Sequence, residues 1–136
     1  MSESRRSAWW AGALLAGLAY LAIGRVFTLP GLNAPSGRLA AWAVSGVVFA
    51  AHMAHEHFRA GSAPRALALH AAAGAALGAF ALAFVAMLHA FSTEGTIRPL
   101  WGLALVLWPA IAGVPAYLVA LAAGLVLARL WPHPLG

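Results

Sequence analysis

Histidine and glutamate gather at one place in an otherwise apolar chain, in the stretch His-Met-Ala-His-Glu-His that begins at His52. On an α-helix, His52, His55 and Glu56 share one face within an arc of roughly 100°. His57 points away from that face, and we expect it to meet solvent or lipid headgroups. His70 follows a short Gly- and Pro-containing connection. If the flanking helices form a hairpin, His52 and His70 lie at nearly equal depth.

These residue types match the ligands of a transition-metal site. Neutral imidazole and carboxylate groups bind zinc, copper, nickel or iron, and a spacing of three and four residues lets one helix face supply several ligands. The candidate metal ligands are His52, His55, Glu56 and His70.

Three other interpretations remain open for the same cluster. His52, Glu56 and His70 could relay protons, because histidine titrates near neutral pH and a carboxylate tunes it. Two of the histidines could ligate haem, which ranks lower because haem ligands must face each other across the ring. The interpretation that we favour is structural: His52 and His70 bond each other or a carbonyl group, and Glu56 pairs with Arg59 or Arg65.

The composition predicts an integral membrane protein. Hydrophobic residues make up 63% of the 136 residues and charged residues 8%, whereas soluble domains have about 45–50% and about 25%. The absence of cysteine excludes disulfides, thiolate nucleophiles, zinc thiolate sites and iron–sulfur clusters. The net charge of +5 comes from arginines at the ends of apolar runs. It therefore indicates contact with headgroups and no nucleic-acid partner.

The apolar residues fall into four segments, each long enough for the roughly 20 helical residues that cross a hydrocarbon core. Barrel strands would be half as long and strictly alternating, so the segments predict helices. Short connections make consecutive helices antiparallel neighbours. We expect an all-α transmembrane four-helix bundle with up-down connectivity and one domain, residues 1–136, with helices over about 8–27, 39–58, 66–91 and 100–131.

The fourth segment is too long for a simple crossing, at roughly 48 Å against a core of about 30 Å. A helix between Trp108 and Trp131 would span roughly 35 Å and place a tryptophan at each interface. Pro109 would then sit in its first turn, and Pro115 would kink it. Leu100–Leu107 is then expected to form a short interfacial or tilted piece.

Small residues indicate where helices approach closely. Gly74 and Gly78 form a Gly-x-x-x-Gly pair in the third segment, and Gly12 and Ala16 lie on a small-residue face of the first. Such faces bring helix backbones together in lipid. We expect them to seal the bundle within one chain rather than to form a homodimer.

Arginine counting favours a cytoplasmic N-terminus and C-terminus, with five arginines inside and three outside. We expect a multi-pass protein of the cell membrane, of the bacterial inner-membrane type. The sequence shows no nucleophile beside a base and no paired acids, which disfavours an enzyme. The function expected is that of a structural, accessory or self-associating subunit, in a homo-oligomer or a larger complex within the lipid bilayer. Metal, proton or haem handling by the histidine cluster is the alternative.

Overall fold

The described part of the chain folds into four α-helices. The computed structural model describes residues 9–95 and 99–131. The helices are α2, Trp9–Val26; α3, Pro35–Phe58; α4, Pro64–Glu94; and α5, Pro99–Leu130. Each is long and apolar enough to cross a membrane. The predicted all-α class with four such segments is confirmed, although the predicted start at residue 8 lies outside the described residues.

Proline and glycine set the helix boundaries. Pro35 and Pro64 stand in the first turns of α3 and α4, where a missing N–H costs little, so both helices begin earlier than predicted. The connection between them contains Gly61 with a φ of 64°, and α4 ends before Gly95 with a φ of 71°. Glycine adopts this left-handed backbone without the steric cost that a side chain imposes.

The predicted fourth helix over about 100–131 corresponds to α5, and Leu100–Leu107 is not separated from it. Helix α5 runs without interruption from Pro99 to Leu130 and contains both Pro109 and Pro115. Membrane helices tolerate internal proline because neighbouring helices and small backbone adjustments satisfy the freed carbonyl groups. The proline kink itself stays a prediction.

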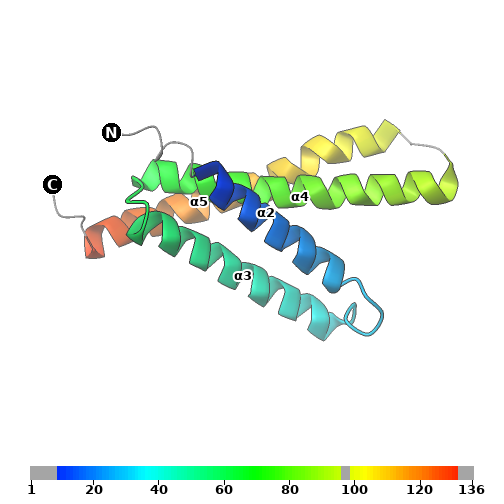
Figure 1. Cartoon of the computed structure of the whole chain (residues 1–136), viewed down its shortest axis with the longest axis horizontal. Helices are drawn as coiled ribbons and strands as arrows, with labels where there is room; N and C mark the ends of the chain where they lie inside the picture. Colours follow the sequence, from blue (N-terminus) through cyan, green and yellow to red (C-terminus); the bar gives the residue numbers. More distant parts are fainter. Residues whose placement is uncertain (1–8, 96–98, 132–136) are drawn as a thin grey trace.

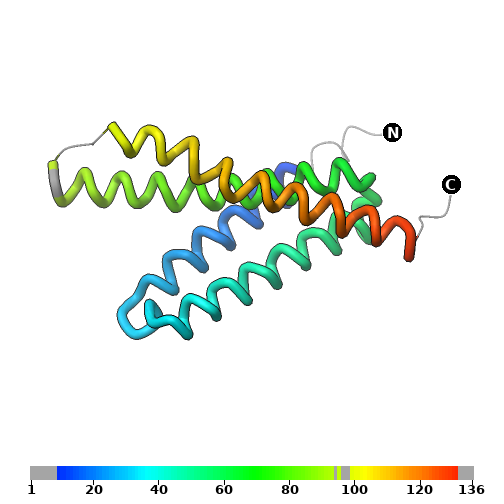
Figure 2. Tube along the Cα trace, turned by 180° about the vertical axis from the view of Figure 1, so that it is seen from behind, coloured from blue at the N-terminus to red at the C-terminus, as the bar shows by residue number. Residues whose placement is uncertain are grey.

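The helices are arranged as a long pair and a diverging pair. Helices α4 and α5 lie alongside each other, while α2 and α3 lead away from them toward the turn at residues 27–34 (Figures 1 and 2). Helix α4 packs mainly against α5 and α2, and it touches α3 less. Chain order therefore predicts the α4–α5 contact well, but it does not predict that α2 is a closer neighbour of α4 than α3 is.

Small residues form the crossing between α2 and α4. A Cβ atom placed on Gly78 would lie 2.6 Å from the Cβ of Tyr20, and one on Gly17 would lie 3.0 Å from the Cβ of Leu77. At these distances neither glycine accommodates even a methyl group without movement of its neighbour. The prediction that these glycines pack within the chain is confirmed.

The core lies where α3, α4 and α5 converge, near the α3–α4 turn. Its buried members come from α4 and α5, and α3 contributes partly buried side chains. They are Leu67, Ala68, Ala71 and Ala120, with Phe49, Met53, Tyr117 and Leu121 packed against them. This packing holds the last turns of α3 beside the first turns of α4, which positions the polar cluster.

Candidate functional site

Glu56 is the centre of the polar cluster. It lies near the end of α3 and is 2% exposed. Its Oε2 atom accepts a hydrogen bond of 2.6 Å from the Ser62 hydroxyl, and it lies 2.7 Å from Nδ1 of His70 on α4. Since a carboxylate can only accept, Nδ1 of His70 is the donor in this pair when Glu56 is ionised. One carboxylate therefore joins α3, the connecting turn and α4.

The backbone of the turn brings Ser62 back to Glu56. The amides of Arg59 and Ala60 donate to the carbonyl of His55 at 2.9 and 3.1 Å, which ends the helix. Gly61 then reverses the chain direction with its left-handed φ, and the amide of Ser62 donates to the Glu56 carbonyl at 3.0 Å. Ser62 thus contacts Glu56 through both its backbone and its side chain.

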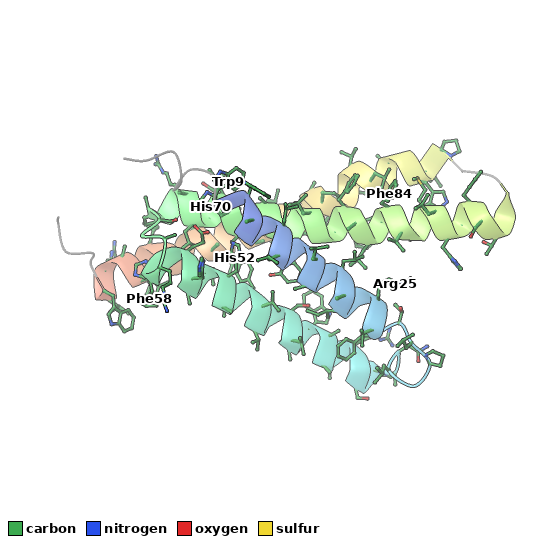
Figure 3. All side chains as sticks on the ribbon, viewed as in Figure 1. Trp9, Arg25, His52, Phe58, His70 and Phe84 are labelled. Atoms are coloured by element: carbon green, nitrogen blue, oxygen red, sulfur yellow. The ribbon has the colours of Figure 1, made fainter. Side chains whose placement is uncertain are left out.

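Helix α2 covers the histidine of the pair. The rings of Trp9 and His70 stack with centroids 5.0 Å apart and an angle of 13° between their planes. Both residues lie together where α2 begins beside α4 (Figure 3). The side chain of His70 is 19% exposed. Stacking fixes the plane of the imidazole ring, and with it the direction of the Nδ1 bond to Glu56.

His52 lies one turn before Glu56 and faces α2. A Cβ atom on Gly12 would lie 3.4 Å from Cε1 of His52 and 3.8 Å from Oε1 of Glu56. The glycine therefore makes room for both side chains at the helix interface. Within the described residues, Nε2 of His52 is buried and has no hydrogen-bond partner. A buried ring nitrogen that lacks a partner thus belongs to the helix residue one turn before Glu56.

His55 is exposed and stands apart from the pair. Together with His52 it lines a cavity of about 280 Å³ between α2 and α3, whose other walls come from small and aliphatic side chains. These are Gly12, Leu15, Ala16, Ala19 and Val48.

The expectation that His57 meets solvent or headgroups is wrong. His57 is 2% exposed. It follows Phe49 and Met53 at intervals of four residues, so it belongs to the stripe of α3 that faces the core. The end of α5 also reaches this region, because the rings of Phe58 and Trp131 lie 6.3 Å apart. The sequence pattern of α3 alone does not show which of its faces turns toward the core.

The structure brings two of the four predicted metal ligands into direct contact. Glu56 and His70 are bonded, His52 lies near Glu56, and His55 is separate. In residues 9–95 and 99–131, no group of three or more His, Asp or Glu side chains is placed to hold a metal ion. The metal interpretation stays a prediction that this geometry does not strengthen.

The structural interpretation named the wrong partners. His70 bonds Glu56 where a bond to His52 or to a carbonyl group was expected, and Glu56 bonds His70 and Ser62 where Arg59 or Arg65 was expected.

Sequence analysis missed three members of the cluster: Ser62, Trp9 and Gly12. The Gly61-Ser62 pair that follows the histidine stretch is a turn signal, and a hydroxyl after such a turn can reach back to the helix end. Gly12 was predicted only to lie on a small-residue helix face. No signal in the sequence places it or Trp9 beside the histidines, because their contacts depend on how α2 crosses α4.

Comparisons with protein-family models, with curated protein sequences and with solved structures find no match. The function is therefore inferred from the geometry of this chain.

Proposed function

We propose that this chain is a small multi-pass membrane protein that acts as a structural or accessory subunit, in a homo-oligomer or a larger membrane complex. The helices cross the bilayer in alternating directions, with both termini in the cytoplasm. The Glu56 cluster then lies toward the cytoplasmic side and fastens α3 to α4.

The observation that supports this role is the internal use of the polar groups. Glu56 is the one acidic side chain that the structure describes, and it is bonded within its own chain to His70 and Ser62. The glycines at the crossing of α2 and α4 are also used inside the chain. Large apolar side chains remain exposed along all four helices, as lipid or an apolar partner requires. An arrangement of this kind favours a scaffold over a catalyst.

The size of the particle extracted from its native membrane tests this proposal. A tagged chain is purified in a mild detergent, and the polypeptide mass of the particle is measured by light scattering. We expect more than one polypeptide per particle at a fixed ratio, either further copies of this chain or a second protein. A particle that holds a single chain across several detergents would contradict the proposal.

A second candidate function is proton handling at the same cluster. Two observations favour it: Oε2 of Glu56 carries both hydrogen bonds, and Nε2 of His52 has no partner among the described residues. Ionisable groups buried in membrane helices commonly mark proton paths. In this mechanism, the Glu56–His70 pair holds a proton, and His52 exchanges it with the cavity that His52 and His55 line.

Proton flux into vesicles tests the second candidate. The full chain is reconstituted into liposomes that contain a pH-sensitive dye, and a potassium gradient with valinomycin drives the flux. We expect flux above empty vesicles, lost in Glu56→Gln and kept in His89→Ala, which changes an exposed histidine near the other end of α4. Vesicles no more permeable than protein-free ones would exclude proton transport by the chain.

A further inference from the structure

The divergence of α3 from α4 and α5 leaves an apolar cleft in the half of the molecule that lies toward the 27–34 turn. Two overlapping cavities of about 430 and 420 Å³ make up this α3 cleft. They share five lining residues, contributed by all four helices: Tyr20, Trp42, Ser45, Ala75 and Ala112. Ligand pockets commonly have volumes of about 300–1,000 Å³.

One face of α3 lines the cleft with a charged, a hydroxyl and two aromatic side chains. Arg38, Trp42, Ser45 and Phe49 follow one another at spacings of four, three and four residues. This spacing keeps them on one face. Arg38 stands in the first turn of the helix. The charged group therefore lies at the mouth of the cleft, and two aromatic rings with a hydroxyl group between them lie further in.

The mouth of the cleft is positively charged and lacks a described counter-charge. Arg38 is exposed, and the first turn of α3 contains no acidic residue. The N-terminus of a helix adds its own positive potential. Glu56, the one acid whose side chain is described, is bonded to His70 near the opposite end of α3. Arg25, at the end of α2, lies at the same end of the α2–α3 pair as Arg38 (Figure 3).

We infer that the α3 cleft binds an anionic phospholipid of the bilayer. Its phosphate contacts Arg38, and one acyl chain lies along Trp42, Ser45 and Phe49 against the small side chains of α4 and α5. An apolar helix from a partner would cover the apolar walls of the cleft but leave Arg38 without a counter-charge. A lipid with a negative headgroup matches both the charged mouth and the apolar walls.

Native mass spectrometry of the full chain tests this inference. The protein is released from detergent in the presence of equal amounts of phosphatidylglycerol and phosphatidylcholine that carry the same acyl chains. We expect one phosphatidylglycerol to be retained per chain in preference to phosphatidylcholine. Arg38→Gln should weaken retention about fivefold, since an arginine near an anionic surface contributes about 1 kcal/mol.

Arg65→Gln is the matched control, because Arg65 is also an exposed arginine in the first turn of its helix but does not line the cleft. It should retain the lipid as the original chain does. Ser45→Leu, which fills the cleft and keeps Arg38, should weaken retention of both lipids.

Four results would overturn the inference. Equal retention of the two lipids would show that the headgroup charge has no role in binding. Equal losses in Arg38→Gln and Arg65→Gln would show that the lipid does not bind specifically at the α3 cleft. Unchanged retention in Ser45→Leu, or a lipid-free particle with a second polypeptide, would show that no acyl chain occupies the cleft.

Discussion

At the scale of single residues, the cluster shows how a carboxylate is kept inside an apolar bundle. Burying an unpaired charge is costly, and the cost falls when hydrogen bonds satisfy its oxygens. Glu56 receives two such bonds on one oxygen. The net stability that these bonds add can be small. Removing one partner is still costly, because it leaves the other polar groups inside the bundle without a bond.

Replacing Glu56 should therefore destabilise the bundle. Glu56→Ala leaves His70 and Ser62 without their acceptor, and we expect a loss of about 1–3 kcal/mol in the free energy of unfolding. Glu56→Gln keeps an acceptor oxygen and should lose less. The measurement is unfolding in mixed micelles of increasing sodium dodecyl sulfate content. His55→Ala, at an exposed site one residue away, is the control, and an equal loss in both alanine variants would contradict the expectation.

The stacked pair of Trp9 and His70 gives a second expectation at this scale. Trp9→Ala removes the ring that covers the imidazole and should cost about 0.5–1.5 kcal/mol beyond the loss of buried area, whereas Trp9→Phe should keep part of it. The same unfolding titration measures both. Trp10→Ala changes a neighbouring ring that is 52% exposed. If Trp10→Ala were the more harmful of the two alanine variants, the stacking would have no structural role.

The histidine cluster shows what sequence can and cannot give at residue scale. The hairpin argument brought Glu56 and His70 to the same end of α3 and α4, and the structure bonds them there. Helical spacing did not fix which of His52 and Glu56 meets His70, because that depends on the rotation of one helix against another. His57 was misplaced because helical spacing alone does not show that the face of α3 with Phe49, Met53 and His57 turns toward the core.

At the scale of the helices, close backbone approach defines how α2 crosses α4. Lipid gives no hydrophobic driving force for this association, so van der Waals packing between small residues has to provide it. The spacing of Gly74 and Gly78 predicted a close helix contact within the chain, but it did not predict that α2 is the helix in contact. The effect of Pro109 and Pro115 on α5 likewise depends on the neighbouring helices.

Adding one methyl group at this crossing should separate the helices. In Gly78→Ala the new Cβ would lie 2.6 Å from the Cβ of Tyr20, and we expect a destabilisation of about 1–3 kcal/mol. Gly102→Ala is the matched control, because a Cβ on Gly102 meets no atom within 4 Å. It should be neutral or gain up to about 1 kcal/mol from the higher helix propensity of alanine. Equal stabilities of the two variants, measured by thermal unfolding in detergent, would show that the crossing is not tightly packed.

At the scale of the whole molecule, the helices differ in length. Helices α4 and α5 contain 31 and 32 residues and α2 contains 18, which corresponds to about 47 Å against about 27 Å. If the helices cross a bilayer as proposed, a hydrocarbon core of about 30 Å matches α2, whereas α4 and α5 tilt or extend into the headgroups. The long pair carries the common core, and the shorter pair opens away from it (Figure 1). The sequence predicted four helices, of which the last two are longer than the first two. It did not predict that the two pairs diverge, since the angle between them depends on contacts between distant segments.

The proposed crossing pattern makes opposite predictions for the two exposed turns that flank α3. Asn33 lies in the turn between α2 and α3, and Ala60 lies in the turn between α3 and α4. The chain has no cysteine, so Asn33→Cys and Ala60→Cys each introduce a single thiol. With both termini in the cytoplasm, a membrane-impermeant maleimide added to intact cells should label Asn33→Cys, and it should label Ala60→Cys only after the membrane is permeabilised. The reverse pattern would place the Glu56 cluster on the outer side. The arginine count argues against this orientation, because it would put the larger number of arginines outside. Labelling of both positions in intact cells would mean that α3 does not cross the bilayer, and the alternating arrangement would then be wrong.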